Sequence, residues 1–174
     1  MAHTALDIGN RKQFFLDHRR FDRSSGIRLR MGTPYQEPRP VLVADKPWEA
    51  QGIGAYNTVI READGQFRLW YAAQMKSGLP QEGAVRLAYA ESEDGIHWTK
   101  PELGLVSFQG STANNPVAPF DERQSMQGAT VYIDKRAPAD ARYKLWSKYQ
   151  PRDDEIEAGV TAGLWAMHSP DGLH

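Results

Sequence analysis

Short stretches in which apolar and polar residues alternate recur along the chain. Residues 67–70 read Phe-Arg-Leu-Trp, and residues 143–146 read Tyr-Lys-Leu-Trp. A period of two is typical of strands with one buried face, and both runs are rich in aromatic residues. Apolar runs at 85–90 and 159–167 predict further strands. Because no long amphipathic helical pattern accompanies them, the sequence predicts an all-β protein with antiparallel sheets.

These strands belong to a unit that occurs twice. Residues 92–98 read Ser-Glu-Asp-Gly-Ile-His-Trp, and residues 169–174 read Ser-Pro-Asp-Gly-Leu-His. The two copies are offset by 169 − 92 = 77 residues, and the alternating strands by 143 − 67 = 76. Thr-Val-Ile at 58–60 recurs as Thr-Val-Tyr at 130–132, an offset of 72. Radial repetition of small antiparallel sheets is a β-propeller, and we expect that fold with long inter-strand loops.

The second copy of the motif stops before the tryptophan that ends the first copy. We therefore expect the front part of a longer repeat protein. Residues 1–46 are predicted to be an N-terminal arm, 47–110 the first unit and 111–174 the second, truncated unit. Residues 100–106 are predicted to form the outer strand of the first unit. Two units alone leave open sheet edges, and self-association through these edges is expected.

Each Ser-x-Asp-Gly motif predicts a tight turn. Ser and Asp side chains accept hydrogen bonds from backbone N–H groups one or two residues further on. Gly95 and Gly172 supply the positive φ that such a turn requires. We interpret His97 and His174 as turn residues rather than as metal ligands or bases. The acidic run at 153–157 lacks the glycine and spacing of a calcium loop and is interpreted as a solvated hairpin tip.

Composition excludes several classes of partner. The formal net charge is −1, with 21 basic and 22 acidic residues, which does not favour nucleic acid. Cysteine is absent, which excludes disulfides and cysteine-ligated metal sites. No segment is long and apolar enough to predict a membrane span, and no signal peptide is visible. We expect no metal ion and no cofactor, and the compartment stays open between cytoplasm, periplasm and exterior.

Several phrases resemble one blade of the five-bladed β-propeller glycosidases. They are Lys-Pro-Trp-Glu at 46–49, Tyr-Asn-Thr-Val-Ile at 56–60 and Phe-Arg-Leu-Trp-Tyr at 67–71. The most distinctive stretch, 88–105, is similar to bacterial proteins of the glycoside hydrolase family 32-like or 43-like type. The resemblance implies a five-bladed propeller with a funnel-shaped active site on its axis, of which about the first two blades are present. It also implies paired carboxylates, one acting as nucleophile or base and another as general acid.

The resemblance makes Glu49 and Asp121 the catalytic candidates. Glu49 is the carboxylate nearest to the position of the family's blade-one acid. Asp121, with Glu122 beside it, is nearest to the position of the family's Arg-Asp-Pro phrase. The sequence departs from both family phrases, since residues 48–51 read Trp-Glu-Ala-Gln and residues 127–129 read Gln-Gly-Ala. The general acid belongs to a third blade that this sequence does not contain.

Four further residues are candidates for substrate binding. Tyr56 and Asn57 open the presumed inner strand of the first unit, where they would meet a sugar hydroxyl. Trp48 is interpreted either as a stacking platform for a sugar ring or as a packing residue. Arg123 lies in the matching region before the second unit.

Three functions follow from this sequence. The first is hydrolysis of a glycosidic bond in an oligo- or polysaccharide, with paired carboxylates and no cofactor. The second is a carbohydrate-binding propeller that has lost catalysis, which the departures from the family phrases favour. The third is a protein-interaction module. Placement of the acids separates the first from the second, and exposed aromatic residues favour sugar binding over protein binding.

Overall fold

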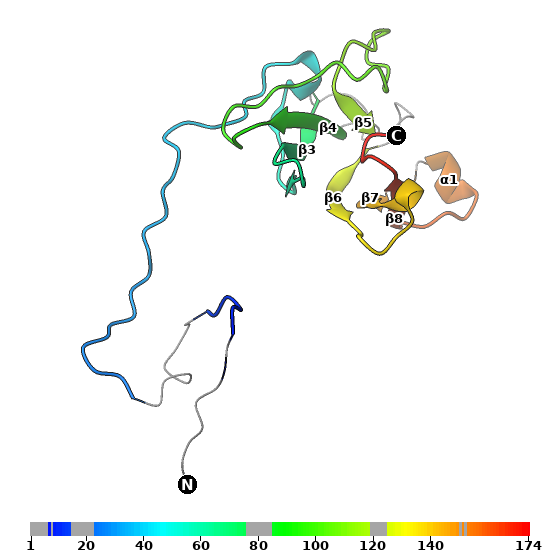
Figure 1. Ribbon diagram of the computed structural model, residues 1–174. Coiled ribbons are helices and arrows are strands. Elements are labelled where there is room, and N and C mark those ends of the chain that lie inside the picture. Colours follow the sequence, from blue (N-terminus) through cyan, green and yellow to red (C-terminus); the bar gives the residue numbers. More distant parts are fainter. Residues whose placement is uncertain are drawn as a thin grey trace. The chain divides into compact units, whose positions relative to one another are not determined.

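The structure is a computed structural model in which the chain divides into two compact parts, Met1–Glu37 and Pro38–His174. It describes residues 7, 9–14, 23–75, 85–118, 125–149, 151 and 153–174. In Met1–Glu37, the described residues 7, 9–14 and 23–37 form turns, bends and irregular backbone. The described strands and helices all lie within Pro38–His174 (Figure 1).

The first sheet is built around two long antiparallel strands. Its strands are β1 (Gly52–Ile53), β2 (Thr58–Arg61), β3 (Phe67–Gln74), β4 (Val85–Ser92) and β5 (Pro116–Ala118). β3 and β4 pair along their whole length. β1 and β2 both pair with the other edge of β3, so that together they act as one interrupted strand. β5 pairs with the free edge of β4.

The second sheet has three antiparallel strands in the order β6-β7-β8. They are β6 (Gln127–Ile133), β7 (Tyr143–Tyr149) and β8 (Gly163–Ser169). A 3-10 helix (Ala139–Ala141) lies between β6 and β7, and helix α1 (Asp153–Glu157) lies between β7 and β8. The acidic run predicted as a hairpin tip is therefore one helical turn. The described part is mostly β with antiparallel sheets, which confirms the predicted all-β class.

Equivalent residues of the repeat pair with each other in the same way in both sheets. Thr58 lies opposite Trp70 in the first sheet, and Thr130 lies opposite Trp146 in the second. These pairs are related by the sequence offsets, since 130 − 58 = 72 and 146 − 70 = 76. The repeat found in the sequence is therefore also a repeat of strand pairing.

The two turn motifs have the same hydrogen bonds. Ser92 Oγ accepts the N–H of Gly95 at 2.9 Å, and Ser169 Oγ accepts the N–H of Gly172 at 2.8 Å. In each turn, the aspartate Oδ1 accepts two following backbone N–H groups at 2.8 or 2.9 Å. The aspartate Oδ2 contacts Nδ1 of its own histidine at 2.6 Å in the first turn and 2.7 Å in the second. The glycine φ angles are 78° and 81°, so the predicted turn geometry is confirmed.

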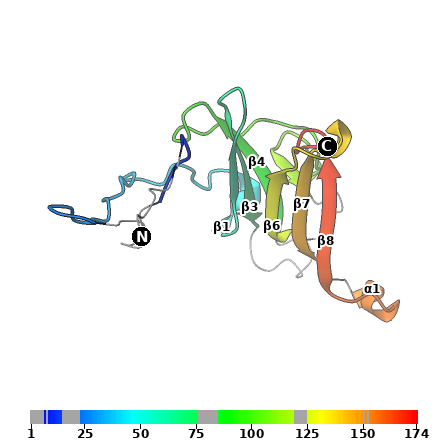
Figure 2. The same cartoon turned by 60° about the horizontal axis from the view of Figure 1, so that its bottom comes forward.

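The second sheet stacks on one face of the first, with β6 lying against β2, β3 and β4 (Figure 2). Trp70 and Tyr89 of the first sheet and Val131 and Tyr143 of the second belong to the core between them. The opposite face of the first sheet has a separate core, in which Trp48 packs with residues of β3 and β4. The first sheet is thus covered on both faces.

The predicted outer strand at 100–106 is wrong. Those residues have irregular backbone, and Thr99 makes only an isolated bridge to Glu91. Pro101 has no N–H to donate to a ladder, and Gly104 has a φ of 74°, which interrupts an extended run. The edge beside β4 is occupied instead by β5, from the range assigned by sequence to the second unit.

Candidate functional site

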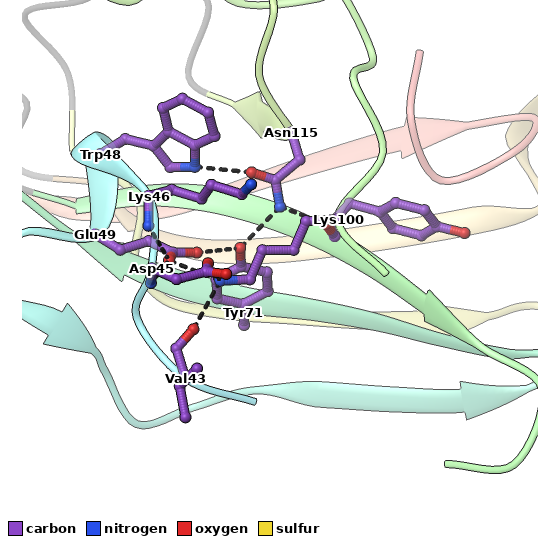
Figure 3. A network of polar contacts seen from close by, with 9 residues as sticks. Val43, Asp45, Lys46, Trp48, Glu49, Tyr71, Lys100 and Asn115 are labelled. Carbon is purple, nitrogen blue, oxygen red and sulfur yellow. Dashed lines mark hydrogen bonds and ion pairs between the residues drawn. The ribbon is translucent and has the colours of Figure 1, made fainter. Parts of the chain in front are cut away.

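Glu49 lies at the centre of a buried polar network (Figure 3). It ends the 3-10 helix Pro47–Glu49, and its side chain is 0% exposed. Tyr71 Oη donates to Oε1 at 2.5 Å, and Lys100 Nζ forms an ion pair with Oε2 at 2.7 Å. The backbone N–H groups of Asp45 and Lys46 donate to the same Oε2 at 2.9 and 3.1 Å. A buried carboxylate needs this number of donors to offset the loss of water.

Lys100 connects this carboxylate to the segment before it. Its Nζ also donates to the carbonyl oxygen of Val43 at 2.8 Å and to Asp45 Oδ1 at 2.7 Å. The hydrogen bond from Lys100 lowers the pKa of Asp45. The Lys100 side chain is 7% exposed, and that of Asp45 is 56% exposed. The ammonium therefore fixes residues 43–49 against the loop that follows the first turn motif.

Tyr71 connects the carboxylate to Asn115 and Trp48. Asn115 Nδ2 donates to Tyr71 Oη at 2.7 Å and to the carbonyl oxygen of Tyr89 at 2.5 Å. Trp48 Nε1 donates to Asn115 Oδ1 at 2.7 Å. Burial, and next the hydrogen bond to Glu49, raise the pKa of the Tyr71 hydroxyl, so that it stays protonated as a donor.

Trp48 is a packing residue in this arrangement. Its side chain is 8% exposed and meets Phe108 edge to face, with ring centroids 5.8 Å apart and an interplanar angle of 73°. Neither Trp48 nor Glu49 presents a free group to solvent. Their contacts hold the segment before β1 on the first sheet.

Tyr56 and Asn57 form a different kind of feature, in the loop between β1 and β2. Tyr56 is 74% exposed and has a φ of 65°, a conformation that is a genuine outlier for a bulky residue. Asn57 Nδ2 donates to the carbonyl oxygen of Gly54 at 3.1 Å, and its Oδ1 accepts the N–H of Ala72 at 3.1 Å. A Cβ at Gly54 would lie 2.8 Å from Nε2 of Gln74. The loop is therefore closely fitted to β3, and it holds the tyrosine ring in solvent.

The same backbone irregularity occurs in the second unit. The offset of 72 places Gly128 at the position of Tyr56, since 56 + 72 = 128. Gly128 also has a φ of 65°, and the pairing of β6 with β7 shifts register there. Glycine adopts this conformation at no steric cost, whereas a tyrosine in the same place is strained. The strain is thus particular to the first unit.

The structure groups the predicted site residues in two places. Trp48 and Glu49 meet in the buried network, and Tyr56 and Asn57 lie in the exposed loop. Asp121 and Arg123 lie outside the described residues. Among the described residues no cluster of three or more potential metal-binding side chains is present.

Sequence reasoning missed three members of the network, which are Tyr71, Lys100 and Asn115. Lys100 and Asn115 lie in irregular segments without periodicity, and they reach Glu49 and Trp48 across 51 and 67 residues. The sequence indicated Tyr71 only as an apolar residue of a predicted strand. A lysine and an asparagine in loops carry no sequence signal of burial, so these partners were found only in the structure.

Comparison of the chain with protein-family models, with curated proteins and with solved structures found no match. No helix in the described part combines the length and the apolar character that a membrane span needs.

Proposed function

We propose that the chain belongs to a carbohydrate-binding protein of the β-propeller type and that Tyr56 is a contact residue for the sugar. The observation that carries the proposal is an exposed tyrosine held at a φ of 65° by a closely fitted loop. Backbone strain of this kind costs about 1–3 kcal/mol and is concentrated at functional sites. The resemblance of residues 46–49, 56–60 and 88–105 to propeller glycosidases supports carbohydrate as the ligand.

Tyr56 has the properties that a sugar-binding residue needs. An aromatic ring offers a flat apolar face that packs on the C–H face of a pyranose or furanose, while its hydroxyl remains available for hydrogen bonding. Asn57 limits the movement of the loop because both ends of its amide are bonded to backbone groups of Gly54 and Ala72. A loop backbone that is already fixed loses little entropy when a ligand binds.

Hydrolysis through Glu49 is less well supported than binding. A glycosidase needs two carboxyl groups that both reach the scissile bond. Glu49 is fully buried and bonded to Tyr71, Lys100 and two backbone N–H groups. We therefore propose binding without a catalytic contribution from Glu49.

Affinity gel electrophoresis in the presence of soluble polysaccharides tests the proposal. The probes are xylan, levan, arabinan and mixed-linkage β-glucan, each copolymerised in a native gel. We expect at least one polysaccharide to retard the chain and Tyr56→Asn to abolish the retardation. Absence of retardation in every gel, or unchanged retardation of Tyr56→Asn, would overturn the proposal.

A stability measurement separates loss of the ring from loss of the fold. Asparagine tolerates positive φ, so Tyr56→Asn should raise the free energy of unfolding by about 1 kcal/mol while it removes binding. The matched control is Gly128→Ala, which introduces strain at the equivalent position where a Cβ would have no neighbour within 4 Å. It should lower the free energy of unfolding by about 1 kcal/mol and leave binding unchanged. Urea denaturation measures both values.

A further inference from the structure

The outer face of the second sheet carries exposed aromatic and aliphatic side chains. Trp146 lies opposite Ala166 across the β7–β8 pair, and Leu164 projects from the same face two residues along β8. Leu164 is 76% exposed and Tyr132 is 41% exposed. Tyr132 stacks on Trp146 with ring centroids 4.9 Å apart and an interplanar angle of 7°. These four residues, Tyr132, Trp146, Leu164 and Ala166, are called the outer patch.

The repeat identifies the corresponding face of the first sheet. Trp70 corresponds to Trp146, since 70 + 76 = 146, and Tyr89 corresponds to Ala166, since 89 + 77 = 166. Trp70 is 1% exposed and Tyr89 is 3% exposed, because the second sheet covers them. The outer patch is thus the second copy of a surface whose first copy is an interface within this chain.

That internal interface has a specific polar part. Trp70 Nε1 donates to the carbonyl oxygen of Gly172 at 2.8 Å, and Arg68 Nη1 donates to that of Asp171 at 3.2 Å. A Cβ at Gly172 would lie 2.6 Å from the Trp70 ring, so the second turn motif packs directly on this indole. The first sheet therefore binds a sheet that ends in a Ser-x-Asp-Gly turn.

The outer patch repeats the donors of this interface. Trp146 holds the register position of Trp70, and Lys144 holds that of Arg68, since 68 + 76 = 144. The indole N–H of Trp146 has no hydrogen-bond partner among the described residues. We propose that the outer patch is the docking site for a further repeat unit of the same kind, an antiparallel sheet that ends in a Ser-x-Asp-Gly turn. The turn carbonyls of that unit would accept hydrogen bonds from Trp146 and Lys144.

A second intact copy of this chain is not the occupant that fits best. In such a copy, the second sheet's inner face is already packed on the first sheet, and the first sheet's other face is covered by Trp48 and its neighbours. Lys144 and Lys148 lie on the same face of β7 as Trp146, so two facing outer patches would each carry these positive charges, and like charges repel. A separate repeat unit has neither difficulty.

The test appends such a unit to the complete chain. Because His174 corresponds to His97, a copy of residues 98–174 joined after His174 continues the repeat in register. We expect the fluorescence of Trp146, isolated by difference from Trp146→Phe, to shift to shorter wavelength in the extended chain. We also expect amide hydrogen exchange across Gly163–Ser169 to slow roughly tenfold or more. Unchanged fluorescence and unchanged exchange would overturn the proposal.

Two variants show whether docking uses the outer patch. Trp146→Glu places a charge in the proposed interface and should return the emission and the exchange rates to those of the original chain. Tyr35→Glu removes an aromatic residue that is 81% exposed and should change neither. Sedimentation of the original chain tests whether a second copy of the chain binds the outer patch instead. If the chain is a dimer that Trp146→Glu converts to a monomer, the outer patch binds a second copy and the proposal is wrong.

Discussion

The two sheets contain the same pattern of strands and turns but differ in what covers them. Trp70 and Trp146 have equivalent partners in the register, and each precedes an equivalent Ser-x-Asp-Gly turn. Trp70 is 1% exposed because the second sheet packs on it, whereas Trp146 is partly exposed. A repeated pattern therefore determines local strand pairing, while the burial of a residue depends on which neighbouring sheet is present.

The opposite faces of the two sheets differ as well. Tyr71 of the first sheet takes part in the network of Glu49, Lys100 and Asn115. The equivalent residue of the second sheet is Ser147, since 71 + 76 = 147, and its hydroxyl donates to the carbonyl oxygen of Gln127 at 3.1 Å. Among the described residues, the polar network therefore lies on the first sheet and not on the second, and it attaches the segment before β1.

The largest expected difference concerns the two tryptophans. Trp70→Ala should lower the free energy of unfolding by about 4 kcal/mol, because a fully buried indole is lost from the core between the sheets. Trp146→Ala should cost about 1 kcal/mol, because the indole is partly solvated already. Urea denaturation measures both. Equal costs would contradict the assignment of burial to the neighbouring sheet.

The next effect tests the polar network. Glu49→Gln should cost about 3 kcal/mol, because it leaves the buried Lys100 ammonium without its most buried carboxylate partner. Asp45→Asn is the matched control within the network. Its side chain is 56% exposed, and it should cost less than about 1 kcal/mol. Ser147→Ala, at the Tyr71 position of the second sheet, should cost about 1 kcal/mol. If Glu49→Gln left the free energy of unfolding unchanged in thermal and urea denaturation, the network would not stabilise the fold.

The smallest effect concerns the turns and their dependence on pH. Hydrogen bonds from His97 and from backbone N–H groups lower the pKa of Asp94. Burial raises the pKa of Asp171, but the hydrogen bonds from His174, Leu173 and Ser169 outweigh it and the net pKa is lowered. A lowered pKa in the folded state stabilises the fold fully above the ordinary value of 3.8, and this stabilisation is lost as the pH falls through the lowered pKa.

The two turns should therefore respond differently to removal of the aspartate. Asp171→Ala should cost about 1 kcal/mol at pH 7, because its turn also packs on Trp70. Asp94→Ala should cost less, because its turn is more exposed. Urea denaturation from pH 7 down to pH 3 measures the loss of unfolding free energy in each variant relative to the unchanged chain. We expect this loss to become smaller below pH 3.8 for both variants. A difference that grows on acidification would contradict the assigned hydrogen bonds.

The sequence predicted the all-β class and the two turns, but it did not predict the polar partners of Glu49. Alternation at 67–70 and 143–146 and the Ser-x-Asp-Gly motifs act over a few residues, so local reading was sufficient for them. The strand predicted at 100–106 was wrong because the apolar residues Leu103 and Leu105 pack against the core from irregular backbone. The polar partners of Glu49 come from distant loops, and no local pattern reports such contacts.

The repeat, the antiparallel strands and the two aspartate turns follow directly from the amino-acid sequence, because they depend on hydrogen bonds and side-chain alternation between near neighbours. The burial of Glu49 against Lys100, the cover over Trp70 but not Trp146, and the strained, solvated Tyr56 depend on how the folded chain packs. Burial and charge pairing depend on residues distant in the chain. Identical local patterns therefore reach different environments once the two sheets are stacked.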